Sequence, residues 1–207
     1  MITLFDHPAS ANGYKVRLLL AQLERPYALR RVDIFAGESR TAAFRRLNPD
    51  GRIPVLQLDD GECIAESNAC LFFLAEGTKL LPEDRLGRAQ VLQWLFFEQN
   101  QLEPNLGTAR YWMLTGRDAG RREALALKRE AASNALAGLD AYLADHPFLV
   151  ADRYSVADVG LFGYTHLADE AGLSLAERPH VAAWVGRVRA QPRFFEGVEP
   201  YPASARA

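Results

Sequence analysis

The chain has 207 residues, 49% of them hydrophobic and 24% charged, with a formal net charge of -2 at pH 7. This size allows one large core or two small ones, and the interspersed charges form no basic stripe for nucleic acid or anionic lipid. No stretch approaches the roughly 18 apolar residues of a membrane span, and no leader pattern opens the chain, so we expect a cytoplasmic protein. Cys63 and Cys70 lack the spacing of a zinc site, so we expect no metal.

The amino-terminal part alternates short apolar runs with helical patterns. Strands are predicted over residues 2–5, 27–34, 55–58 and 62–65, and helices over residues 14–23, 41–47 and from about Ser67. Asp59-Asp60-Gly61 predicts a hairpin between the last two strands. The order predicts an open mixed sheet with helices packed on it, as in a thioredoxin-like domain over residues 1–78, although the spacing alone also fits other small α/β domains.

Every later apolar segment has helical spacing. Helices are predicted over residues 89–100, 123–143, 156–171 and 181–190, with a loop at residues 115–120 and a capping box at Ser155-Val156-Ala157-Asp158. These segments predict an all-helical bundle domain over residues 86–207, joined to the first domain by a linker at residues 79–84. The tail from Glu199 to Ser204 contains two prolines, and we expect it to fray or to lie along the surface.

Two short stretches predict a pocket for an extended peptide that carries a carboxylate. In Gly51-Arg52-Ile53-Pro54-Val55-Leu56, a proline inside an apolar run belongs at a bend or at the start of a strand. In Glu66-Ser67-Asn68-Ala69-Cys70, an acidic residue and a hydroxyl open an apolar helix. The free backbone N–H groups of that helix start form a carboxylate site.

Five blocks carry a resemblance to a known family. They are residues 10–17 (SANGYKVR), residues 47–56 (LNPDGRIPVL), Glu66-Ser67, Ser155-Val156-Ala157-Asp158 and residues 184–192 (WVGRVRAQP). In this order and at these separations they resemble the glutathione S-transferase family over nearly the whole chain. The loop block is similar to theta/delta-like bacterial members, which use a serine near the amino terminus.

The resemblance implies a thioredoxin-like glutathione domain, a helical domain and a homodimer. It implies that Pro54 is cis and that the backbone of Ile53 pairs with the cysteinyl part of glutathione. It implies that Glu66 and Ser67 take the γ-glutamyl group. Arg52 and Arg40 are candidates for the glycine carboxylate of glutathione, on charge alone.

The chemistry of such a site requires a thiolate. A free thiol with a pKa near 8.5 is mostly protonated at neutral pH, and lowering that pKa by about two units needs roughly 2.7 kcal/mol. Ser10 stands just before the helix predicted from Tyr14, so its hydroxyl is predicted to donate to the sulfur of glutathione, with Asn12 as the rival donor. Many relatives carry a cysteine where Gly13 stands, and this departure disfavours mixed-disulfide chemistry.

The leading hypothesis is a glutathione transferase that attacks a hydrophobic electrophile, with reduction of hydroperoxides as a side activity. The electrophile pocket is expected to be apolar and to include Tyr111 and Trp112 of the second domain, although aromatic residues at such spacing are more often core. Glutathione is then a co-substrate. The alternatives are a glutathione-dependent disulfide reductase or dehalogenase, and a stress adaptor that binds glutathione without catalysis.

Overall fold

The structure of the chain is a computed structural model that describes residues 1–206. It forms two compact units, each described here by itself. Unit 1 comprises Met1–Glu76 and Pro192–Pro200, and unit 2 comprises Gly77–Gln191 and the residues from Tyr201 onward.

Unit 1 is built on a four-stranded mixed sheet. Its strands are β1 (Thr3–Asp6), β2 (Ala28–Arg31), β3 (Val55–Gln57) and β4 (Cys63–Ala65), in the order β2-β1-β3-β4. β1 is parallel to β2, while β3 is antiparallel to both β1 and β4. The predicted mixed sheet with a terminal hairpin is therefore confirmed, and each strand lies within the range that the apolar pattern predicted or one residue beyond it.

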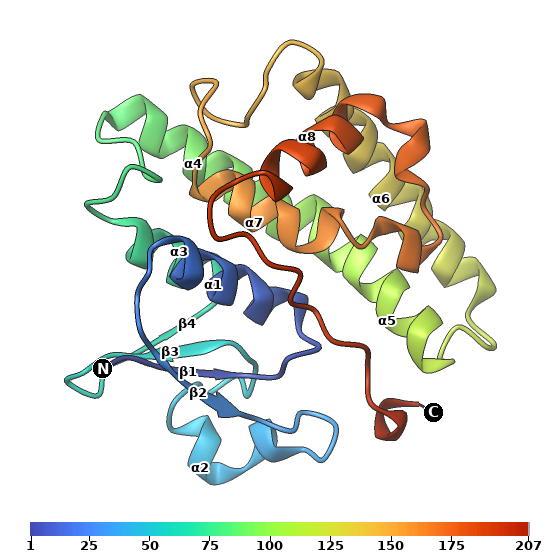
Figure 1. Cartoon of the computed structure of the whole chain (residues 1–207). Coiled ribbons are helices and arrows are strands. Elements are labelled where there is room, and N and C mark those ends of the chain that lie inside the picture. The colour runs from blue at the N-terminus through green and yellow to red at the C-terminus, as the bar shows by residue number, and fades with distance from the viewer. Residues whose placement is uncertain (207) are drawn as a thin grey trace. The chain divides into compact units, whose positions relative to one another are not determined.

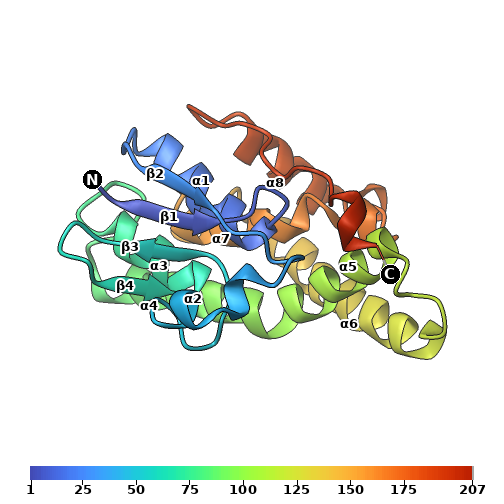
Figure 2. The same cartoon turned by 90° about the horizontal axis from the view of Figure 1, so that it is seen from below.

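Three helices cover the sheet of unit 1. α1 (Ala11–Gln22) and α3 (Ser67–Ala75) contact each other on one face, and the short α2 (Ala42–Arg45) lies on the other face (Figure 1). Figure 2, from below, shows α2 in front of the sheet. On the α2 face Phe44 packs with Val32 and Val55. The leucines at positions 18, 19 and 20 of α1 are fully buried, so apolar burial fixes this helix on the sheet.

Unit 2 is helical. Its helices are α4 (Arg85–Phe97), a π-helical segment (Glu98–Gly107), α5 (Thr108–Thr115), α6 (Arg122–Leu143), α7 (Val156–Thr165) and α8 (Pro179–Arg189). Short 3₁₀ turns occur at Glu38–Arg40 in unit 1 and at Ala168–Ala171, Leu175–Glu177 and Ala203–Ala205 in unit 2. None of the helices within residues 1–206 has the length and apolar character needed to cross a membrane.

The core of unit 2 is α7, all ten residues of which are buried. The predicted capping box is present at its start. The carboxylate of Asp158 accepts from the backbone N–H groups of Ser155 (2.9 Å) and Leu149 (3.1 Å) and from the indole N–H of Trp184 (2.9 Å). One buried side chain therefore joins the helix start to the preceding loop and to α8.

One helix differs from its expected length. The helix predicted over residues 156–171 ends at Thr165 and is followed by a separate 3₁₀ turn, because Leu167 leaves the helical conformation at φ -102 and ψ 12. Of the two alternatives for the tail, the structure shows the second: exposed residues such as Glu199 and Ser204 lie along the surface. Glu199 N–H donates to the carbonyl of Pro8 at 3.1 Å, and the ring of Tyr201 packs edge-on against Tyr111.

Candidate functional site

Strand register brings three chain segments to one end of the sheet in unit 1. Phe5 is opposite Val55, and Val55 is opposite Ala65. The loop that follows β1, the residue that precedes β3 and the residue that follows β4 are therefore neighbours. These positions hold the Ser10 loop (His7–Ser10), Pro54 and Glu66 with Ser67.

Ser10 caps α1. Its backbone is extended, and its hydroxyl oxygen accepts from Gly13 N–H at 3.1 Å. The hydroxyl proton has no acceptor among the residues that the structure describes, and the first turn of α1 holds no acidic residue. A hydroxyl donor and the positive end of a helix therefore point to the same place, which suits an anion.

Asn12 and Ser67 lie in contact, together with Lys15. The hydroxyl of Ser67 donates to the side-chain carbonyl of Asn12 at 3.1 Å, and Lys15 Nζ donates to the same oxygen at 2.8 Å. Lys15 Nζ is also 3.5 Å from the hydroxyl of Ser67. Lys15 is fully buried, and Ser67 is almost so. The carbonyl of Asn12 is thus engaged by two donors at the start of α3.

The Ile53-Pro54 peptide bond is cis, as the family resemblance implied. Asn48 holds the loop that precedes this bond. Its side-chain amide nitrogen donates to Arg52 O at 2.8 Å, and its side-chain carbonyl oxygen accepts from Asp50 N–H at 3.1 Å. Gly51 has a φ of +66, and a Cβ there would lie 2.8 Å from Ser39 O. Only glycine suits that position, since both the dihedral angle and the space exclude a side chain.

Glu66 precedes α3 in an unusual conformation. Its φ is 67 although it is not a glycine, and conformations of this kind cost on the order of 1–3 kcal/mol and occur preferentially at functional sites. The acidic residue that was predicted to open this helix is its N-cap residue, but the side chain of Glu66 makes no cap hydrogen bond, and Ser67 is already helical. The first N–H groups of α3 remain without helical partners.

The two candidate arginines are exposed. Arg52 Nε forms an ion pair with Asp50 at 2.8 Å. An exposed ion pair of this kind contributes little to stability. Arg40 ends a 3₁₀ turn, and its side chain lies 3.4 Å from an ideal Cβ at Gly51. Both arginines therefore flank the loop that leads to Pro54.

Tyr111 and Trp112 belong to α5 in unit 2 and are half-buried. The guanidinium of Arg117 lies 5.1 Å from the ring centre of Tyr111, and that of Arg121 lies 5.6 Å from the ring of Trp112. Tyr201 covers an edge of Tyr111. The pair is surrounded by cations and by the tail, so it is less apolar than the sequence led us to expect.

Three buried charged residues near the site were not singled out from the sequence. Lys15 and Arg17 occur in an apolar helix, and Asp6 ends β1. Arg17 Nε lies 3.0 Å from Asp6 Oδ2. The spacing of Asn12 and Lys15, three residues apart on a helix, was the one available signal that these two side chains meet.

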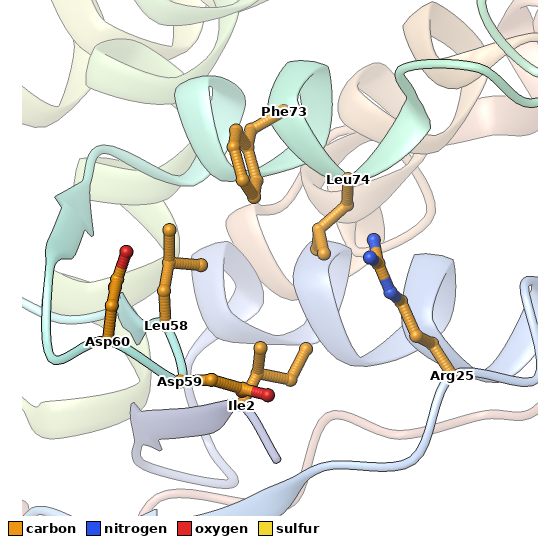
Figure 3. Close-up of a pocket in the computed structure, with 7 residues that line it drawn as sticks. All are labelled: Ile2, Arg25, Leu58, Asp59, Asp60, Phe73 and Leu74. Carbon is orange, nitrogen blue, oxygen red and sulfur yellow. The ribbon is translucent and has the colours of Figure 1, made fainter.

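A separate depression of about 300 Å³ occurs at the opposite end of the unit 1 sheet (Figure 3). Ile2 precedes β1 and Leu58 follows β3, whereas Ser10 follows β1 and Pro54 precedes β3. In Figure 3, Phe73 and Leu74 point from α3 toward this space, with Arg25 on one side and Asp59 and Asp60 on the other. The depression is therefore not part of the site at Ser10 and Ser67.

Within residues 1–206, no group of three or more His, Cys, Asp or Glu side chains is arranged so that it could hold a metal ion. Cys70 is buried and Cys63 half-buried, and both are free thiols. Burial raises the pKa of Cys70 to about 12. Its thiol is thus protonated at neutral pH and unsuited to nucleophilic attack.

Comparison with protein families gives two matches. The model of the glutathione S-transferase N-terminal domain matches residues 1–76, and the model of the glutathione S-transferase C-terminal domain matches residues 122–187. The chain is 32% identical over 201 residues to the disulfide-bond oxidoreductase YfcG of Escherichia coli (strain K12), across 93% of this chain and 92% of that protein.

Solved structures agree with these matches. The chain superposes on a glutathione S-transferase from Pseudomonas fluorescens [Pf-5] with a TM-score of 0.92 and 42% identity, across 94% of this chain and 98% of that one. It also superposes on Ure2p in complex with glutathione, with a TM-score of 0.83 and 26% identity, across 93% and 91% of the two chains.

Asp6 predicts a pH dependence of stability. Burial raises the pKa of Asp6 to about 7, while Arg17 acts in the lowering direction. The folded protein therefore keeps a proton that the unfolded chain releases above about pH 4. Stability should fall as the pH rises from about 4 to about 7, by roughly 1.4 kcal/mol per pH unit from this group.

Urea unfolding of the wild type and of Asp6→Asn across that window measures this slope. The free energy of unfolding of the variant, taken relative to the wild type, should increase with pH. Asp60→Asn, at an exposed position, is the control and should run parallel to the wild type. Parallel curves for Asp6→Asn would contradict the prediction.

Proposed function

Because this chain belongs to the glutathione S-transferase family, we propose that it is a glutathione transferase. The thiol of glutathione loses its proton and attacks an electrophilic carbon, a carbon–sulfur bond forms, and the leaving group departs with the electron pair. The observation that supports this proposal best is the meeting of the Ser10 loop, cis-Pro54 and Ser67 at one end of the sheet.

Glutathione binds along that end of the sheet in an extended conformation. Its γ-glutamyl carboxylate is held by the backbone N–H of Ser67 at the start of α3 and by the hydroxyl of Ser67, whose proton turns from the carbonyl of Asn12 to the ligand. Glu66 contacts the same γ-glutamyl group. The backbone of Ile53 pairs with the cysteinyl part. Arg40 and Arg52 attract the glycine carboxylate, and their high exposure fits a role in long-range attraction more than in tight binding.

Ser10 stabilises the thiolate. A hydrogen bond to a charged group contributes about 1.5–3 kcal/mol, and a helix start adds about 0.3–1 kcal/mol. Together they reach the roughly 2.7 kcal/mol that a lowering of two pKa units needs. We favour Ser10 as the donor because its hydroxyl proton has no acceptor within the described residues, whereas Lys15 and Ser67 hold the side chain of Asn12 toward the start of α3 through its carbonyl oxygen.

The electrophile is hydrophobic, and Tyr111 and Trp112 contribute to its binding. The cations beside both rings favour an electrophile that also carries substituents with partly negative oxygen atoms, such as nitro groups. Reduction of a hydroperoxide is a side activity, in which two glutathione molecules give one glutathione disulfide, an alcohol and water. The same anionic sulfur serves both reactions.

A second candidate function is glutathione-dependent disulfide reduction. It is favoured by the relative YfcG, which is named a disulfide-bond oxidoreductase. In this reaction two glutathione molecules reduce a substrate disulfide to two thiols and become glutathione disulfide. It requires no cysteine of the protein, so the glycine at position 13 does not exclude it.

Binding and turnover test these candidates. Calorimetry with glutathione should give heat of association at millimolar concentrations. Turnover should be assayed with a nitro-substituted aryl chloride, an organic hydroperoxide and a small disulfide. Fastest turnover of the aryl chloride supports the transferase, fastest turnover of the disulfide supports the second candidate, and binding without any turnover would leave a non-catalytic adaptor.

A further prediction concerns the hydrogen-bond donor to the sulfur of glutathione. Ser10→Ala should raise the pKa of the bound glutathione thiol by about one to two units, because the variant lacks a hydrogen bond worth roughly 1.5–3 kcal/mol. Affinity for S-methylglutathione, which has no ionisable thiol, should stay unchanged. Ultraviolet absorbance of the thiolate against pH measures the shift. If Asn12→Ala rather than Ser10→Ala shifts the titration, the roles are reversed.

Another prediction concerns the γ-glutamyl group. Ser67→Ala should weaken glutathione binding by roughly 10- to 100-fold, since a hydrogen bond to a carboxylate contributes about 1.5–3 kcal/mol. The turnover of bound substrate should change less than the affinity. Calorimetric titration measures the affinity. An unaltered dissociation constant would remove Ser67 from the site.

We also propose a homodimer in a reducing, cytoplasmic setting. α4 presents Ala89, Leu92 and Phe96 to solvent at spacing i, i+3, i+7, and Phe96 is 69% exposed. An exposed apolar face of this kind favours association. Light scattering after size exclusion should give twice the chain mass for the wild type and one chain mass for Phe96→Glu. Leu127→Glu, at a leucine 66% exposed on α6, should remain dimeric, and a monomeric wild type would refute the dimer.

A further inference from the structure

Arg17 is a buried cation that contacts three separate segments of unit 1. It is 7% exposed. Its Nη2 donates to Pro8 O at 2.9 Å and to Ser10 O at 3.4 Å, and its Nη1 donates to Gly197 O at 2.7 Å. Its Nε lies 3.0 Å from the carboxylate of Asp6. One side chain of α1 thus holds β1, the Ser10 loop and the C-terminal segment Pro192–Pro200.

Asp6 accounts for the burial of this cation. An unpaired guanidinium in the interior would cost several kcal/mol. The fully buried carboxyl group of Asp6 lies beside it and carries its negative charge above its raised pKa of about 7. Asp6 is also fixed through its backbone, because its carbonyl accepts from Val32 N–H at 2.9 Å. Asp6 therefore anchors the Arg17 side chain to the sheet.

The C-terminal segment is fitted to the same place (Figure 1). Glu199 N–H donates to Pro8 O at 3.1 Å, and the hydroxyl of Tyr14 donates to Phe195 O at 2.7 Å. A Cβ at Gly197 would lie 2.8 Å from the ring of Tyr14. The segment passes so close to Tyr14 of α1 that only a glycine fits at position 197, and it contacts the Ser10 loop at Pro8.

We propose that Arg17, anchored by Asp6, is a positioning residue for thiol activation, which holds the Ser10 loop against α1 and the C-terminal segment so that the Ser10 hydroxyl meets the sulfur of glutathione. This inference rests on the proposed function. Arg17 itself does not touch glutathione. It acts through the backbone carbonyl groups of Pro8 and of Ser10 itself, both of which belong to the Ser10 loop.

The size of the effect follows from the geometry of a single donor. A hydrogen bond to an anion weakens steeply when its angle or distance changes, and a misplacement of about 1 Å lowers rates by up to roughly 100-fold. Loss of the Arg17 contacts should therefore raise the pKa of the bound thiol and lower kcat by about 10- to 100-fold. It should leave the affinity for S-methylglutathione within about twofold, because the Ser67 end of the site lies on other elements.

Two variants test the proposal. Arg17→Lys keeps the charge beside Asp6 but cannot reach three carbonyl groups at once. The double variant Asp6→Asn with Arg17→Met removes both charges together, which keeps the core neutral and is the milder way to lose a buried pair. Each should be measured for the thiolate titration of bound glutathione, for kcat and for binding of S-methylglutathione.

The controls separate positioning from general structure. Arg193→Met breaks an exposed ion pair with Glu24 on the same C-terminal segment and should behave like the wild type. In the double variant Ser10→Ala with Arg17→Lys, the pKa of the thiol should be no higher than in Ser10→Ala alone, because Arg17 acts through Ser10.

The outcomes are distinct. Thiolate titrations of both Arg17 variants that match the wild type overturn this inference, and so do additive effects in the variant that combines Ser10→Ala with Arg17→Lys. A loss of S-methylglutathione affinity as large as the loss of kcat assigns Arg17 a merely structural role and also overturns it. A wild type that binds no glutathione overturns the proposed function itself.

Discussion

The candidate site depends on the register of three short strands. The pairing of Phe5 with Val55 and of Val55 with Ala65 places the end of β1, the start of β3 and the end of β4 in one row. Because a shift by one residue would turn every side chain to the other face, the buried pattern of β1 and β3 fixes this row. Three loops that are far apart in the sequence then meet without any of them being long.

At this end of the sheet the backbone leaves its regular hydrogen bonds, and the unpaired groups become available to a ligand. α1 and α3 both start here, and neither has an acidic residue in its first turn. Two helix starts and the buried ammonium of Lys15 place partial and full positive charges beside Glu66 at this end of the sheet, on a chain whose net charge is -2. The attraction of an anionic tripeptide that we propose would therefore be a local property of the site, and the overall charge of the chain says little about it.

The sequence predicted the elements of unit 1 well because each signal was local: apolar runs with strand or helical spacing, and the hairpin signal Asp59-Asp60-Gly61. It did not predict α5 or the π-helical segment, since Pro104 and the polar residues around it give no clear helical period. It also missed Arg17 and Asp6, because a charged residue in an apolar helix is expected to reach solvent, and only the tertiary fold places its partner beside it. Ser10, Asn12 and Ser67 came from the family resemblance, and the structure adds their contacts.

Gly13 connects the core to the chemistry. An ideal Cβ at this position would lie 1.8 Å from Asp6 Oδ1, so the carboxylate occupies the space that a side chain would need. A cysteine there would have to displace the carboxylate of Asp6, which lies beside Arg17. Such a displacement costs free energy because protein interiors are closely packed and overpacking is destabilising. The position of Asp6 beside Arg17 therefore leaves no room for a protein thiol at position 13. The chemistry that we propose for this loop accordingly uses the sulfur of a bound ligand and a hydroxyl or amide of the chain.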